Sequence, residues 1–208
     1  MENSKENQKP ILVKIANQLL KDQQELDSLA VQLSLGKADA KDKLKEVKAE
    51  IREKLQELRG VVSSGYKESK EWAEDTNTAI DELEEALEES VEEIFEESKS
   101  KIIHAAEKLK EQIKSNPASE KLALLYATFY EKAHLQLELL EHSAHVKKEE
   151  LTENYKHNIE KARKSANAII EKLNDKKEEA EVRIEIFKEE LDEVYKHLKK
   201  AVKAFSQK

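Results

Sequence analysis

The sequence predicts an all-α protein made of long antiparallel helical hairpins. Three observations lead to this class. The 208 residues include only three glycines and two prolines, whereas a sheet protein of this length needs many turns built from such residues. Charged residues make up 39% of the chain, in a composition dominated by Ala, Glu, Lys and Leu that is typical of long helices. Apolar residues also recur at alternating steps of three and four, which places them on one helix face.

The first apolar stripe predicts one helix of about 50 residues, roughly 75 Å long at 1.5 Å per residue. Residues 1–9 are polar and are expected to be disordered, and Pro10 suits the first turn of a helix. Asp22 and Gly36 interrupt the stripe, and Gly36 is compatible with either a kink or a close helix crossing. The stripe comprises Leu12, Ile15, Leu19, Leu26, Leu29, Leu33, Ala40, Leu44, Val47, Ile51, Leu55, Leu58 and Val62.

A turn is expected near residues 60–65, where Gly60 and Gly65 can terminate a helix and serines can cap the next one. A second stripe then runs from Trp72 to Ile113 and predicts one helix that ends before Pro117. Trp72, the sole tryptophan, is expected to anchor the tip of the hairpin. Residues 10–114 are therefore interpreted as the first hairpin.

Residues 118–206 are interpreted as a second hairpin, with stripes over 122–173 and 180–205 and a turn near 174–177. The turn signal is weak, so one kinked helix is the alternative. A shift of 115 residues lays the first hairpin's stripes on those of the second, which suggests a duplication. The two hairpins can bury their stripes against each other as one elongated, coiled-coil-like four-helix bundle, or as a dimer of more open hairpins.

The charge balance limits the classes of partner. A net charge of −8 argues against nucleic-acid binding and against simple docking on anionic lipid. The chain has no cysteine, which fits a cytoplasmic protein. The N-terminal residues lack the apolar core of a signal peptide, and the longest apolar stretch, 122–130, is too short to span a membrane.

Two polar clusters contain residue types that can bind metal ions. Residues 71–97 carry thirteen acidic side chains and no Lys or Arg, but a straight helix does not converge oxygen ligands on a cation. This stretch is interpreted as a solvated face, or as one matched to the basic residues Lys196, Lys199, Lys200 and Lys203. The second cluster combines three histidines with glutamates and lacks the spacing of known metal motifs, so it is interpreted as surface histidines rather than a metal or pH-sensitive site; its members are His134, His142, His145, Glu138, Glu141 and Glu149.

One stretch is apolar around most of the helix. Ordinary amphipathic helices keep one polar face, so this stretch either lies at the centre of the bundle or forms an interface. The candidate interface residues are Leu122, Leu124, Leu125, Tyr126, Phe129 and Tyr130. No catalytic, cofactor-binding or metal-binding residues are predicted, because nucleophile elbows, phosphate loops and zinc motifs are lacking.

Several segments resemble the small bacterial coiled-coil family called stress-response proteins. The resemblance rests on residues 50–58, the Ser64-Gly65 turn, Trp72 and residues 80–87, and the segment 182–205 is similar to the family's second helix. It implies a stress-linked, non-enzymatic role. We therefore expect a structural or interaction protein that binds protein partners or itself, without cofactor or small-molecule substrate. The alternative is an amphipathic-helix protein that binds membrane surfaces reversibly.

Overall fold

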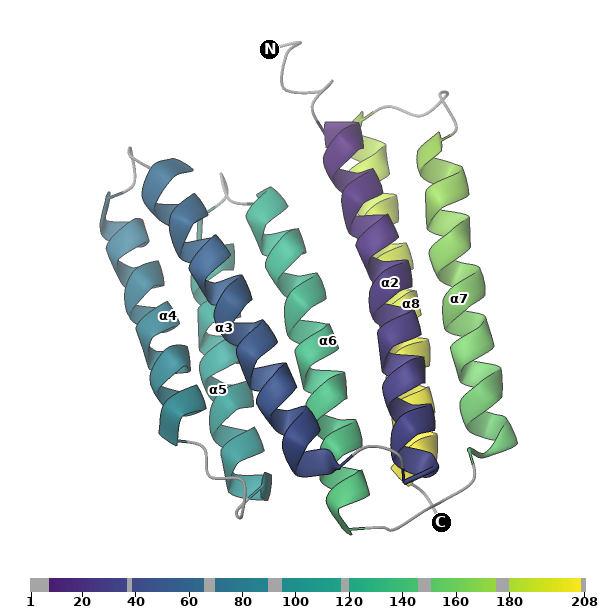
Figure 1. The fold of residues 1–208 in the computed structure, drawn as a ribbon. Helices are drawn as coiled ribbons and strands as arrows, with labels where there is room; N and C mark the ends of the chain where they lie inside the picture. The colour runs from purple at the N-terminus through teal and green to yellow at the C-terminus, as the bar shows by residue number, and fades with distance from the viewer. Residues whose placement is uncertain are drawn as a thin grey trace. The chain divides into compact units, whose positions relative to one another are not determined.

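The computed structural model describes residues 8–36, 39–65, 70–89, 95–116, 120–145, 151–174 and 180–206. Over these residues it contains seven helices and no strand, so the predicted all-α class is confirmed (Figure 1). The helices are α2 (Gln8–Ser34), α3 (Ala40–Gly65), α4 (Lys70–Glu89), α5 (Phe95–Lys114), α6 (Glu120–His145), α7 (Glu153–Asn174) and α8 (Ala180–Ser206). None of the described helices is both long enough and apolar enough to cross a membrane.

The helices group into two compact units, and the grouping differs from the two hairpins expected. Residues 1–37 and 146–208 form one unit, which contains α2, α7 and α8 and is called here the three-helix unit. Residues 38–145 form the four-helix unit, with α3 to α6. The expected division between residues 114 and 118 is therefore wrong. The four-helix unit is inserted into the sequence of the three-helix unit.

The long helix expected over residues 10–58 is two helices, because local capping groups interrupt it. Gly36 has a positive φ of 62°, a conformation that glycine adopts without the steric cost of a side chain. Its N–H donates to the carbonyl of Leu33 at 3.0 Å and closes the end of α2. Asp39 then starts α3, since its carboxylate accepts a hydrogen bond from the N–H of Lys41 at 2.8 Å. The first helix expected to end near residues 60–65 ends at Gly65, and Gly60 lies inside α3.

The single helix expected over residues 72–113 is likewise two helices, which pack against each other. Residues 90–94, between α4 and α5, lie outside the described residues. Trp72 is buried at the start of α4 and donates from its indole N–H to the carbonyl of Gln112 at 2.9 Å, near the end of α5. In the resulting pair, acidic α4 faces lysines on α5, and Glu82 lies 2.7 Å from Lys108.

A third interruption separates α6 from α7, so the helix expected over residues 122–173 is also wrong. Thr152 is not helical, and its hydroxyl accepts a hydrogen bond from the N–H of Tyr155 at 3.1 Å, which caps the start of α7. The next helix pair, α7 and α8, packs closely side by side. The chain therefore reverses between Asn174 and Ala180, and the intervening residues 175–179 lie outside the described part of the chain.

The four-helix unit is a ring of neighbours, in which α3 packs on α4, α4 on α5, α5 on α6 and α6 on α3. Each of α3, α4 and α5 turns one apolar stripe inward, and burial of these stripes stabilises the unit. The fully buried side chains of this unit include Leu44, Leu55, Ile80, Leu83, Leu87, Ile102, Leu109, Leu135, Leu139 and Leu140.

The three-helix unit combines the α7–α8 hairpin with α2, which packs on both of its helices. Tyr155 lies between the other two helices at the start of α7. Its hydroxyl donates to a carboxylate oxygen of Asp27 on α2 at 3.2 Å, and its ring lies 6.1 Å from that of Phe205 on α8. Burial raises the pKa of the Tyr155 hydroxyl, so this group stays protonated as a donor.

The buried face of α2 contains polar residues among its leucines. Asp22 is buried and accepts a hydrogen bond from the amide of Gln18 at 2.7 Å. Gln23 is fully buried, and neither atom of its amide group has a hydrogen-bond partner among the described residues. A buried amide without partners is destabilising, because it has lost its bonds to water without replacing them. The buried face of α2 therefore contributes less to the free energy of unfolding than its leucines alone would.

Gln23→Leu should therefore stabilise the protein. We expect the free energy of unfolding to rise by about 1–3 kcal/mol, the usual cost of an unsatisfied buried polar group. Gln24→Leu is the matched control, since Gln24 is the exposed neighbour and its substitution should change stability by less than about 0.5 kcal/mol. Urea denaturation followed by circular dichroism measures both. A loss of stability in Gln23→Leu would show that the amide is satisfied in solution.

Candidate interaction surface

The six candidate interface residues all lie on α6, but they do not share one exposed face. Leu122, Leu124, Tyr126 and Tyr130 are buried, and Phe129 is half-buried. Leu125 remains 47% exposed. Most of this stretch is therefore part of the protein interior, as the bundle-centre interpretation requires, and Leu125 is the member that stays accessible.

The two tyrosines of this stretch attach α6 to α5. The Tyr126 hydroxyl donates to the carbonyl of Ala106 at 3.0 Å. The Lys110 ammonium lies 4.4 Å from the centre of the Tyr130 ring, a favourable cation–π geometry. Burial, followed by the nearby carboxylates of Glu107 and Glu131, raises the pKa of Tyr130 to about 12. These two tyrosine side chains therefore hold α6 against α5 and are not accessible to a partner.

On its other side, α6 is joined to α3 by a largely buried ion pair. The Lys132 ammonium lies 2.5 Å from a carboxylate oxygen of Glu50, and Lys132 is only 4% exposed. The Gln136 amide approaches the other oxygen of the same carboxylate at 3.5 Å. A buried charge without its partner is strongly destabilising, so this pair fixes the register of α3 against α6. The line along which α3 and α6 meet is called here the α3–α6 seam.

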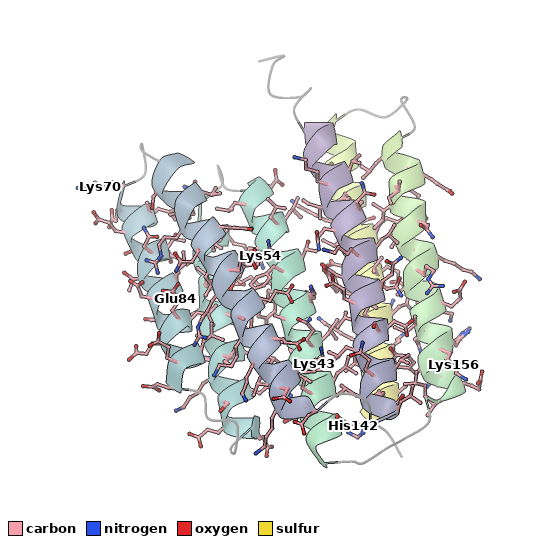
Figure 2. The ribbon with its side chains drawn as sticks, viewed as in Figure 1. Lys43, Lys54, Lys70, Glu84, His142 and Lys156 are labelled. Atoms are coloured by element: carbon pink, nitrogen blue, oxygen red, sulfur yellow. The ribbon has the colours of Figure 1, made fainter. Side chains whose placement is uncertain are left out.

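Two exposed apolar side chains lie along the same seam. Val61, 46% exposed, follows Glu50 by three helical turns and so lies on the same side of α3. Leu125 precedes Lys132 by two turns on α6. Since α3 and α6 run antiparallel, both residues lie toward the same end of the unit (Figure 1). Lys54, labelled in Figure 2, lies on α3 between Glu50 and Val61 in the sequence, about two helical turns before Val61.

Neither Val61 nor the Glu50–Lys132 pair was identified from the sequence. Val61 stands next to Val62, which belongs to the predicted stripe and is buried. This doublet places one apolar residue inside and one outside the stripe, and it is the signal that could have drawn attention to Val61. Lys132 carried a weaker signal, as a cation between the apolar residues of α6.

Four residues of the acidic stretch pair with basic residues of neighbouring helices within its own unit. The Arg59 guanidinium of α3 lies 2.6 Å from Asp81 and 2.9 Å from Glu84 of α4. Glu82 and Glu89 of α4 face Lys108 and Lys101 of α5, at 2.7 and 3.6 Å. These four residues are thus matched by α3 and α5, whereas the lysines expected to match the acidic stretch belong to α8 in the three-helix unit. Residues 92 and 93 lie outside the described part.

An acidic excess nevertheless remains in the four-helix unit. Residues 38–145 hold 16 Lys and Arg against 26 Asp and Glu, a net charge of −10, whereas the rest of the chain carries +2. Glu71, Glu85 and Glu88 of α4 are exposed. Glu84, on the same helix, is labelled in Figure 2. The negative charge of the chain is thus concentrated in this unit.

The histidines of α6 lie close in sequence to glutamates of the same helix. His134 pairs with Glu138 on the same helix at 3.3 Å. The side chains of His145 and Glu149 lie outside the described part of the chain. Among the side chains that the structure describes, no group of three His, Cys, Asp or Glu could hold a metal ion.

A histidine that the sequence did not single out, His197 on α8, is largely buried. Its Nε2 lies 3.2 Å from a carboxylate oxygen of Glu193. Burial lowers the pKa of His197; Glu193 opposes this effect, and Lys200, Lys161 and Lys196 add to it. The imidazole thus sits among three lysines from α7 and α8, where an added positive charge is unfavourable.

Comparison with known proteins gives no relative for the chain. No protein-family model matches it, and no curated protein or solved structure is significantly similar to it.

Glu50→Gln should destabilise the protein, because it removes the carboxylate charge that faces the buried Lys132 ammonium. We expect a loss of about 1–3 kcal/mol in the free energy of unfolding, since the Glu50 side chain itself is 33% exposed. Glu53→Gln, at an exposed position of the same helix, is the control and should cost less than about 0.5 kcal/mol. Equal effects of the two substitutions in urea denaturation would mean that the pair is solvated and does not fix the seam.

His197 should make the protein less stable in mild acid. Because its pKa is lower in the folded state than its ordinary value of about 6.5, the unfolded chain takes up a proton first as the pH falls. The contribution of His197 to stability is therefore lost as the pH falls below about 6.5. Denaturation curves at several values between pH 8 and pH 5 should show a weaker pH dependence for His197→Gln than for the exposed-site variant His157→Gln. Identical pH dependence in the two variants would contradict this account.

Proposed function

We propose that this chain is a non-enzymatic interaction protein that binds a protein partner through the α3–α6 seam. The observation that carries the proposal is the exposed pair Val61 and Leu125 at one end of the seam. Single exposed apolar residues are ordinary, but two large ones on adjacent helices at one end of a bundle form the kind of small apolar centre around which protein interfaces are built.

The surroundings of the pair support a protein partner. Lys54, Glu53 and Glu57 precede Val61 on α3 by about one to two helical turns and carry charges of both signs. An apolar centre with a mixed polar rim is the usual composition of a non-obligate protein interface. The Glu50–Lys132 pair and the tyrosines on α5's side keep both helices fixed, so the surface is preorganised for binding.

The resemblance of residues 50–58 and 80–87 to stress-response hairpin proteins suggests when this binding takes place. These segments lie within α3 and α4, in the same unit as the seam. The proposal accordingly includes a stress-linked role for a cytoplasmic chain.

A photo-crosslinking residue placed at Val61 tests this function in living cells. We expect discrete crosslinked protein bands from this position and none from a probe at Glu88, which is exposed on α4 of the same unit. Adding Leu125→Asp to the Val61 probe should lower the crosslinked yield at least tenfold, because a charge is placed in the apolar centre. Since about half of the Leu125 side chain is exposed, the free energy of unfolding should fall by only about 1 kcal/mol.

The same experiment separates the protein-partner role from the alternatives. Equal crosslinking at Val61 and Glu88 would indicate random collisions and contradict the proposed surface. Crosslinks to lipid in place of protein would instead support the membrane-surface role considered from the amphipathic helices.

A further inference from the structure

The break between α2 and α3 interrupts an apolar stripe that stays in phase. Leu33, Gly36, Ala40 and Leu44 follow at steps of three, four and four, which is the spacing of one uninterrupted helix. Leu33 and Leu44 are both buried in their own helices. The sequence from Ser34 to Ala40 is thus compatible both with the observed break and with a continuous helix from α2 into α3.

Two small local interactions favour the break. Gly36 takes the left-handed conformation at φ 62°, and Asp39 caps α3 through its hydrogen bond to the Lys41 N–H. Each of these is worth little compared with the burial of a whole helix face. Small changes in them can therefore shift the balance between the two forms.

The surface of the α7–α8 hairpin on which α2 packs can be occupied equally well by α2 of another copy. The contacts across this surface, such as the hydrogen bond from the Tyr155 hydroxyl to Asp27, join residues 128 positions apart in the sequence. They would be identical if the two residues came from two chains. Five residues, 35–39, separate α2 from α3, and short hinge loops are known to promote exchange of elements between copies.

We propose that α2 is an exchangeable helix, and that the apolar face of the α7–α8 hairpin is a docking surface for α2 of a second copy. In the exchanged dimer, Gly36 is helical and α2 continues into α3 as one long helix. Each copy then donates its α2 to the hairpin of the other. The proposal goes beyond the partner binding at the α3–α6 seam and does not depend on it.

The exposed side chain next to the hinge supports this dimer. Leu35 is 52% exposed, the highest value among the large apolar side chains described. In an exchanged dimer the two hinges are the segments that gain new neighbours, because every other contact is already made in the monomer. Burial of Leu35 by these new neighbours would favour the exchanged dimer.

Gly36→Ala tests the proposal by sedimentation of the full chain over a range of concentrations. Alanine disfavours the left-handed conformation and favours the helix, so each hinge should shift about tenfold toward the extended form. With two hinges per dimer, the association constant should rise roughly a hundredfold. Gly36→Asn is the matched control, because asparagine tolerates the left-handed conformation, and it should rise far less. Asp39→Ala removes the cap by an independent route and should also favour the dimer.

Crosslinking shows whether such a dimer is exchanged. The chain has no cysteine, so one tagged copy can carry Asp27→Cys and a second copy Asn154→Cys, next to Tyr155. When the Gly36→Ala forms of both are mixed, unfolded and refolded together, a flexible bismaleimide should join them into heterodimers. Monomeric Gly36→Ala and Asp39→Ala at high concentration would overturn the proposal. A dimer that gives no such heterodimer crosslink would overturn it as well.

Discussion

The fold depends on the burial of one apolar stripe per helix. Hydrophobic residues make up 38% of the chain and charged residues 39%, so most helices have one face to bury and one to leave in water. Such helices are unstable alone and must pack against other helices. Helices α3 to α6 pack against one another, and they also follow one another in the sequence. Helix α2 finds its partners in α7 and α8, so a four-helix unit lies inside the sequence of a three-helix unit.

Polar interactions decide how these stripes are aligned. Arg59 joins α3 to α4, Lys108 joins α5 to α4, and the buried Glu50–Lys132 pair joins α3 to α6. The exposed pairs contribute little energy each, but mismatched charges would penalise other registers. The same arrangement leaves Val61 and Leu125 exposed along a fixed seam. A rigid apolar centre with a charged rim is suited to binding another protein.

The helical class and the buried face of nearly every helix could be predicted from the sequence, because the periodicity of apolar residues depends only on local spacing. The helix breaks could not be predicted in this way, since the stripe stays in phase through Gly36 and the capping residues Asp39 and Thr152 are single polar groups. Pairing between distant helices leaves no local pattern either, so α2 was assigned to the wrong neighbours. The candidate interface was read from hydrophobicity alone, which cannot distinguish buried Tyr126 from exposed Leu125.

Hydrogen exchange of the whole chain carrying Ile159→Ala most directly tests the division into an interrupted three-helix unit and an inserted four-helix unit. Ile159 is buried on α7, and removing its side chain lowers the stability of the unit that contains it. The account predicts faster exchange in α2 and α8 together with α7, and unchanged exchange in α3 to α6. Unchanged exchange in α2 combined with faster exchange in α3 would contradict it, because α2 would then belong with the helix that follows it.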